Sequence, residues 1–230
     1  MTDLFYDSAY LGIVITLAAY LFGAFLKKKL KSAVFNPVLI AVAVLIAFLA
    51  LTKTDYQAYN AGAKFISMLL TPATVCLAVP LYEQFEALKK NWAAVLAGIL
   101  SGVLASLLSV FLFCLLFRFS HTEYATLLPK SITTAIGMGV SEELGGIPSL
   151  SAALIILTGI TGNLLAEPVL KLLKIRNPVA QGVAIGSSSH AIGTSKALEI
   201  GDTQGAMSSL SIVASGILTV ILAPLFARLI

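Results

Sequence analysis

One uncharged stretch decides the fold class of this chain: Trp92-Ala-Ala-Val-Leu-Ala-Gly-Ile-Leu-Ser-Gly-Val-Leu-Ala-Ser-Leu-Leu-Ser-Val-Phe-Leu-Phe-Cys-Leu-Leu-Phe117. At a rise of about 1.5 Å per residue, a helix of this length exceeds the roughly 30 Å hydrocarbon layer of a bilayer. The stretch therefore predicts a transmembrane helix. Four further uncharged, apolar stretches predict the same structure: Ala9 to Leu26, Ser32 to Thr52, Leu144 to Ala166 and Thr203 to Ala227.

The composition of the whole chain supports this fold class. Hydrophobic residues make up 58% of the 230 residues, whereas charged residues reach only 11%. A soluble domain carries about 25% charged residues, so the chain is predicted to be an integral membrane protein, with residues 1–230 forming a single transmembrane domain. The net charge of +4 is small and dispersed, which argues against nucleic acid as a partner.

Three other apolar segments are interrupted by helix-breaking or polar residues. In hydrocarbon, a broken helix is tolerated only where protein or a water-filled cavity covers the freed backbone groups. The three breaks therefore predict a polar cavity, although the prolines alone would also fit ordinary kinks in packed helices. The segments and their expected breaks are Phe65 to Tyr82 with Pro72 and Pro80, Tyr124 to Ser141 with Pro129, and Asn177 to Ser195 with Gly186 and Gly193.

Basic residues predict the topology, because cytoplasmic loops retain lysine and arginine. Basic clusters at Lys27 to Lys31, Lys89 to Lys90 and Lys171 to Arg176 follow three of the apolar segments. All three clusters are cytoplasmic only if Tyr124 to Ser141 enters and leaves on one side. The sequence thus predicts an all-α polytopic membrane protein with about seven transmembrane helices and one re-entrant segment. The N-terminus is expected outside and the C-terminus inside the cytoplasmic (inner) membrane.

Two parts of the chain share a layout that suggests an inverted repeat. Both Phe65 to Phe117 and Gln181 to Ile230 contain a broken element, an acidic turn and a long apolar helix. In the seven-helix topology these two parts run in opposite directions. Paired broken segments of this kind are typical of transporters whose substrate site lies near the middle of the membrane.

The second broken segment contains the first candidate binding residues. We expect Pro129 to begin a helix whose first turn carries Lys130, Ser131, Thr133 and Thr134. Free backbone N–H groups, hydroxyls and an ammonium at a helix start are the components of an anion site. The alternative is that Lys130 extends to the membrane surface while the hydroxyls cap a surface helix.

The third broken segment adds a second group of candidates around one histidine. Ionisable residues within a membrane segment are functional candidates by default, and an imidazole titrates near neutral pH. His190 is therefore a candidate for proton coupling, with Glu142 as the other; alternatively, a neutral His190 only links helices. The expected solute-binding residues of this segment are Ser187, Ser188, Ser189, His190 and Thr194.

Other features of the sequence predict packing and exclude metal chemistry. Gly98, Gly102 and Ser106 recur every four residues, which predicts a face that another helix approaches closely. Cys76 and Cys114 have no partner at metal-ligand spacing, and the two histidines lie far apart. We expect no metal, no cofactor and no enzymatic activity.

Several motifs, in order along nearly the whole chain, resemble the LrgB/CidB family. That resemblance implies an inner-membrane protein that acts with a small LrgA/CidA-type membrane partner. Bacterial members carry antiholin-like or autolysis-modulating labels, and relatives that include a plant plastidic glycolate/glycerate translocator move small carboxylates. The motifs are Thr71 to Tyr82, Leu128-Pro-Lys-Ser-Ile-Thr-Thr134, Gly145-Gly-Ile-Pro148, Gly186-Ser-Ser-Ser-His-Ala-Ile-Gly-Thr-Ser-Lys-Ala197 and Glu199 to Ser209.

Two functions remain open at this point. The first is a transport subunit for small monocarboxylate anions, bound between the three broken segments, with Lys130 meeting the carboxylate. The second is an antiholin-like regulatory subunit that modulates a holin-like partner and murein hydrolase activity without moving solute itself. In either case the small-residue faces leave room for a homo-oligomer.

Overall fold

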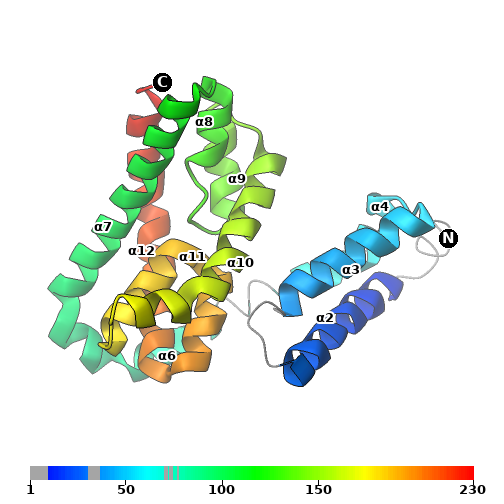
Figure 1. Cartoon of the computed structure of the whole chain (residues 1–230), viewed down its shortest axis with the longest axis horizontal. Helices are drawn as coiled ribbons and strands as arrows, with labels where there is room; N and C mark the ends of the chain where they lie inside the picture. The colour runs from blue at the N-terminus through cyan, green and yellow to red at the C-terminus, as the bar shows by residue number, and fades with distance from the viewer. Residues whose placement is uncertain (1–9, 31–36, 70–71, 73–74, 77) are drawn as a thin grey trace. The chain divides into compact units, whose positions relative to one another are not determined.

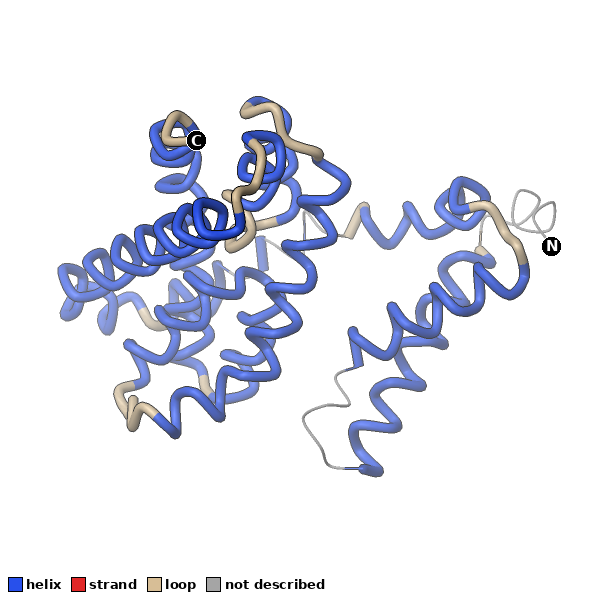
Figure 2. Tube along the Cα trace, turned by 45° about the horizontal axis from the view of Figure 1, so that its top comes forward, coloured by secondary structure: helices blue, strands red, loops and turns tan. Residues whose placement is uncertain are grey.

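The structure is a computed structural model that describes residues 10–30, 37–69, 72, 75–76 and 78–230 (Figure 1). These residues form helices joined by loops, without any strand among them (Figure 2). The predicted all-α class is therefore confirmed. The chain divides into two compact units, Met1–Cys76 and Leu77–Ile230.

Among the described residues, the long helices of the first unit are α2 (Leu11–Leu30), α3 (Pro37–Thr52) and α4 (Tyr56–Ser67). Helix α2 contacts both of the others at glycines, because a Cβ at Gly12 or Gly23 would collide with backbone atoms of α4 or α3. Next to the first contact, the hydroxyls of Thr16 and Tyr59 share a 2.7 Å hydrogen bond. The short side chains thus allow close packing of apolar helices.

The second unit is built around long apolar helices. Among the described residues of the whole chain, α2 and three helices of this unit, α7, α10 and α12, are long and apolar enough to cross a membrane. The chain is therefore a polytopic membrane protein. The helices of the unit are α6 (Ala78–Glu83), α7 (Phe85–Phe117), α8 (His121–Leu127), α9 (Thr134–Glu143), α10 (Pro148–Leu172), α11 (Pro178–Ile200) and α12 (Asp202–Ala227).

Helices α7 and α12 run in the same direction. At one end, Thr203 Oγ1 donates a 3.2 Å hydrogen bond to Gln84 Oε1. At the other end, His121 Nδ1 lies 2.9 Å from the carbonyl of Ile230, and the C-terminus lies beside α8 (Figure 1). The predicted inverted relation between Phe65 to Phe117 and Gln181 to Ile230 is therefore wrong, since their long helices are parallel.

Helices α8 and α9 form a re-entrant hairpin, as the sequence predicts for Tyr124 to Ser141. The segment returns to the end at which it started, because His121 Nε2 lies 3.0 Å from the carbonyl of Leu144. The backbone N–H of Ile147 likewise donates to Thr126 Oγ1 at 2.9 Å. At about 11 and 15 Å, neither helix is long enough to cross the membrane.

Pro129 interrupts this segment in a different way from the one expected. Helix α8 ends at Leu127 and α9 begins at Thr134, so Pro129 lies in the turn between them and begins no helix. Its carbonyl accepts a 3.3 Å hydrogen bond from the N–H of Ile132, which closes the turn. Lys130 and Ser131 therefore lie at the tip of the hairpin, and only Thr133 and Thr134 lie at a helix start.

Helix α11 also folds back on itself, with the reversal at His190. His190 has φ 42° and ψ −143°, whereas the residues on both sides are helical. A straight helix would separate Gly182 from Leu198 by about 24 Å. Yet both residues contact the same turn of α12. A Cβ at Gly182 would meet Gln204, and a Cβ at the next residue, Gly205, would meet Leu198. Residues 178–189 and 191–200 are thus two antiparallel arms of a second hairpin.

This geometry corrects two expectations about α11. Its arms are about 18 and 15 Å long, so Asn177 to Ser195 enters and leaves at one end of the unit instead of crossing. Gly186 and Gly193 do not break the helix, since both have helical backbone angles. Gly186 instead lets α12 approach closely, because a Cβ there would collide with the backbone of Ser208.

The second unit therefore contains an inverted arrangement that the sequence analysis did not identify. In each half, one long helix is followed by a hairpin. The hairpin enters and leaves the unit at the end where that long helix stops. Helices α7 and α10 run in opposite directions. Helix α7 ends next to α8, whereas α10 begins beside α8 and ends next to the start of α11. The α8–α9 hairpin and the α11 hairpin consequently enter from opposite ends.

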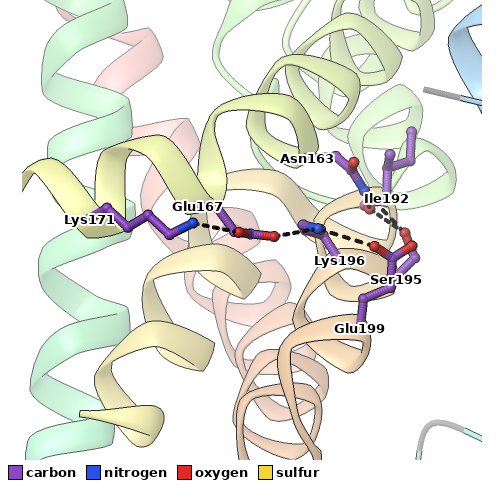
Figure 3. Close-up of polar contacts among 7 residues, drawn as sticks. All are labelled: Asn163, Glu167, Lys171, Ile192, Ser195, Lys196 and Glu199. Carbon is purple, nitrogen blue, oxygen red and sulfur yellow. Dashed lines mark hydrogen bonds and ion pairs between the residues drawn. The ribbon is translucent and has the colours of Figure 1, made fainter. Parts of the chain in front are cut away.

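The returning arm of α11 is fixed to α10 by polar side chains (Figure 3). Lys196 Nζ lies 2.6 Å from Glu167 Oε1 and 3.1 Å from Glu199 Oε2. Nearer the reversal, Asn163 Nδ2 donates to the carbonyl of Ile192 at 2.8 Å. These contacts pair polar groups that the returning arm would otherwise leave unsatisfied at membrane depth.

The first predicted break lies mostly outside the described residues. Pro72 is described, but residues 70–71, 73–74 and 77 around it are not, so the expected break there stays a prediction. Pro80 occupies the first turn of α6, where a backbone N–H has no partner within the helix. Residue 77, immediately before α6, lies outside the described residues, so the expected break at Pro80 also stays a prediction.

The reversal of α11 makes a testable prediction about topology. In a variant whose Cys76 and Cys114 are replaced by serine, Arg176→Cys and Arg228→Cys should react with an impermeant thiol reagent from opposite sides. The expected control is Lys89→Cys, which should react from the same side as Arg176→Cys. Reaction of Arg176→Cys and Arg228→Cys from one side would restore the topology with a crossing at Asn177 to Ser195.

Candidate functional site

The tips of the two hairpins meet beside the middle of α7. Lys130 Nζ, at the tip between α8 and α9, donates to Ser106 Oγ at 3.4 Å and to Ser131 Oγ at 3.2 Å. The two serine hydroxyls share a 2.8 Å hydrogen bond. From the opposite end, the incoming arm of α11 runs along α7, where Gly98 and Gly102 face Val183 and Ser187.

A cavity of about 900 Å³ lies between α7, the Lys130 tip and the incoming arm of α11. Its walls carry many hydroxyl and amide groups, and Lys130 alone among the described lining residues is charged. Such a mixture of small apolar walls and a few polar groups suits a small solute. The polar lining residues are Asn91, Ser101, Ser106, Ser109, Lys130, Ser131, Asn177, Ser187 and Ser188.

A second cavity of about 400 Å³ lies on the other side of the same tip, against α10. It is lined by Lys130, Ser188 and Ser189 together with Thr158 and Thr161 of α10. Ser188 and Ser189 are linked through a 3.0 Å hydrogen bond between their hydroxyls. Gly162 gives Ser189 its space, because a Cβ there would collide with the Ser189 hydroxyl.

The ammonium of Lys130 is half-buried and lacks a countercharge. No carboxylate of the described part of the chain lies within ion-pair distance of it, and its hydrogen-bond partners are two neutral hydroxyls. A charge taken out of water without a partner is costly, so an anion that binds next to it gains both attraction and charge-assisted hydrogen bonds. The arrangement therefore provides the chemistry of a binding site for a monovalent anion.

The structure brings together about half of the residues predicted for the site. Lys130, Ser131, Ser187 and Ser188 line the larger cavity, and Ser189 lines the second one. Four predicted residues line neither cavity: Thr133, Thr134, His190 and Thr194. Thr133 caps α9 with its backbone, and the Thr194 hydroxyl bonds to Ser208 Oγ of α12 at 2.7 Å.

The candidates for proton coupling lie away from the lysine. Glu142 is exposed near the end of α9 and lines neither cavity. His190 is buried, and its Nε2 lies 2.9 Å from the carbonyl of Ile155 in α10. The ring occupies a space that only glycine leaves, since a Cβ at Gly159 would lie 2.5 Å from His190 Cε1. This geometry favours a structural histidine that fixes the reversal.

One wall of the cavity has a second role that its sequence did not predict. The small-residue face of α7 does allow close approach by α11 at Gly98 and Gly102, as predicted. The same face, however, also forms the polar wall, with Ser101, Ser106 and Ser109. The repeated serine hydroxyls on this face of α7 are the sequence signal for a polar wall. Because serine is also common where helices pack closely, the sequence does not distinguish the two roles.

The larger cavity reaches the basic end of the unit. Asn91 and Asn177 line it there, and they directly follow Lys89–Lys90 and Lys174–Arg176 in the sequence. Asn177 is held by hydrogen bonds from the N–H groups of Val179 and Ala180, as the N-cap of α11. A cluster of positive charge beside an opening raises the local concentration of anions.

Comparisons with known proteins find related sequences over nearly the whole chain. The model of the LrgB-like family matches residues 16–229. The chain is 37% identical to the antiholin-like protein LrgB of Bacillus subtilis (strain 168), over 97% of each chain. It is 35% identical to the antiholin-like protein LrgB of Bacillus cereus (strain B4264), over 94% of this chain and 95% of that one. No solved structure matches the chain.

The contacts of His190 predict a structural defect when the ring is removed. His190→Leu should lower the free energy of unfolding by roughly 1–3 kcal/mol, because it loses the bond to Ile155 while the backbone strain remains. Thermal melting in detergent measures this effect, with Glu142→Gln, at an exposed residue that lines neither cavity, as the control. His190→Gln should keep the pH dependence of anion binding. A flattened pH profile in His190→Gln, at unchanged melting temperature, would contradict the structural role and support proton transfer.

Proposed function

The chain belongs to the LrgB-like family, and we propose that it is a subunit that binds a small monocarboxylate at Lys130 and moves it across the membrane. The observation that carries this proposal is the unpaired ammonium of Lys130 between two re-entrant hairpins. Re-entrant or broken helices that meet from opposite ends of a membrane protein are typical of solute sites in transporters.

The other groups around the cavity support an anion of one charge and small size. Lys130 supplies a single positive charge, which matches one carboxylate. The hydroxyls of Ser106, Ser131 and Ser188 are available to bind the hydroxyl or keto oxygen of solutes such as glycolate, glycerate or pyruvate. At about 900 Å³ the cavity admits such a solute with water around it.

A second function is favoured by the names of the relatives. Both are called antiholin-like protein LrgB, and these names support a regulatory role more directly than they support transport. In this function the chain modulates a holin-like partner, and thereby murein hydrolase activity, without moving solute. The two functions are compatible with one molecule if anion binding at Lys130 controls the regulatory contact.

Either function is proposed to involve other membrane components. We expect the chain to act with a small LrgA/CidA-type membrane protein in the cytoplasmic membrane, with the basic end of the second unit facing the cytoplasm. Because α12 ends at the opposite end of the unit, this orientation places the C-terminus outside, in contrast to the inside location expected from the sequence. Exposed small residues of α7 outside the cavity, such as Ala93 and Ala97, leave a surface on which a partner helix or a second copy of the chain would fit.

Lys130→Ala should weaken binding of pyruvate or glycolate by about 10- to 150-fold, because hydrogen bonds to a charged group contribute roughly 1.5–3 kcal/mol. Binding to the purified protein and uptake into liposomes, with and without an LrgA-type partner, measure this effect. Lys64→Ala, an exposed lysine of α4, is the matched control and should bind normally. Lys130→Arg should not restore full affinity, because the planar guanidinium replaces a compact ammonium. Unchanged binding in Lys130→Ala would contradict the proposed site.

The regulatory function predicts a different pattern. Deletion of the gene for this chain in its host should change the rate of autolysis. If solute binding plays no part in regulation, complementation with a gene that carries Lys130→Ala should restore normal autolysis. If Lys130→Ala instead fails to complement, while its membrane level stays normal, regulation depends on the anion site. A host whose autolysis is unaffected by deletion would contradict the regulatory function.

A further inference from the structure

Each hairpin of the second unit carries a lysine inside the membrane, and the two lysines have different partners. Lys196 Nζ lies 2.6 Å from Glu167 Oε1 and 3.1 Å from Glu199 Oε2, so two carboxylates hold its charge whether or not a solute is bound. Within the described residues, Lys130 Nζ contacts two serine hydroxyls and no carboxylate. The charge of Lys130 therefore depends on what the cavity contains.

The partners of Lys130 suit both a charged and a neutral side chain. Ser106 Oγ and Ser131 Oγ lie 3.4 and 3.2 Å from Lys130 Nζ and 2.8 Å from each other. Because a hydroxyl both donates and accepts, the two serines accept hydrogen bonds from an ammonium, and one of them donates to a neutral amine after its O–H rotates. A charge removed from bulk water without a countercharge is costly, so the empty site favours the neutral amine.

Lys130 alone carries an ionisable side chain among the described residues that line the two cavities. On each surrounding helix, the ionisable residues nearest in sequence to the cavity walls line neither cavity, and Glu167 and Lys196 already pair with each other. A proton bound together with a solute at this site therefore has one acceptor. The nearest ionisable residues are Cys114 on α7, Tyr124 on α8, Glu142 on α9, Glu167 on α10, and His190 and Lys196 on α11.

We propose that Lys130 is the proton carrier of the transport cycle, neutral in the empty site and protonated once for each monocarboxylate that binds. Water in the cavity supplies the proton, which adds to the nitrogen lone pair as the anion binds beside it. Release of the anion returns the proton to water and restores the neutral amine. One proton thus moves with one anion, and no net charge moves. This inference rests on the proposed function, and it assigns the coupling to Lys130 in place of His190 or Glu142.

The number of protons taken up with pyruvate tests this assignment in the purified full chain. Calorimetric titration at pH 8.5, in two buffers with different ionisation enthalpies, measures that number. An ordinary lysine, with a pKa of about 10.4, is roughly 99% charged at this pH and takes up almost no proton, whereas we expect about one proton per pyruvate. The matched controls His190→Gln and Glu142→Gln should give the same number as the wild type.

Two kinds of permanent cation at position 130 keep the charge and remove the proton exchange. The guanidinium of Lys130→Arg stays protonated at every pH of these measurements, so pyruvate should bind, with reduced affinity, without proton uptake. In the background without Cys76 and Cys114, Lys130→Cys provides a matched pair. Its product with aminoethyl methanethiosulfonate carries a titratable amine and should take up a proton with pyruvate, whereas its trimethylammonium product should not.

Three outcomes would overturn the assignment. Pyruvate binding to the wild type without proton uptake would do so and would retain the anion site of the proposed function. Proton uptake that persists in Lys130→Arg and in the trimethylammonium product, or that disappears in His190→Gln, would give the proton to another group. Absence of pyruvate binding to the wild type would contradict the proposed function itself, and the proton carrier with it.

Discussion

The second unit depends on the reversal of α11 inside a membrane, where every backbone polar group needs a partner. His190 adopts a backbone conformation with φ 42° that costs a residue with a side chain on the order of 1–3 kcal/mol. Its ring is held by Ile155 in a space that Gly159 leaves open, and the Thr194 hydroxyl donates to the His190 carbonyl at 3.0 Å. These contacts stabilise a turn that would otherwise expose its backbone to hydrocarbon.

The reversal has consequences for the whole site. Because α11 turns back, its incoming arm stops at the middle of α7 and presents Ser187 and Ser188 to the cavity. Because the α8–α9 hairpin enters from the other end, Lys130 arrives at the same depth and bonds to Ser106. A continuous helix in either segment would fill this space with side chains. The cavity and its single lysine are thus products of two short hairpins between long helices.

The same arrangement separates structural polar groups from those available to a ligand. The charged groups of α10 and the returning arm are already paired, as in the contacts of Glu167 with Lys171 and Lys196. Within the described residues, every buried side-chain nitrogen or oxygen has a hydrogen-bond partner. Lys130 differs because its partners are neutral, so its charge remains available to an anion. This difference, more than the number of polar residues, distinguishes the site from the rest of the polar interior.

The sequence alone determined the membrane environment, the long apolar helices and the re-entrant segment before α10. It also selected Lys130, Ser131, Ser187 and Ser188 as candidate site residues, and all four line the larger cavity. These follow from local properties: hydropathy, helix length, basic clusters and the cost of polar groups in hydrocarbon. The sequence did not determine the reversal at His190, the parallel course of α7 and α12, or the serine wall of α7. A run of glycines and serines is compatible with a kink, a crossing or a hairpin, since no residue type in it excludes any of the three. The tertiary structure decided among them, because only the packing of α11 against α10 and α12 satisfies the His190 ring, the close glycine contacts and the ion pairs of Lys196 together.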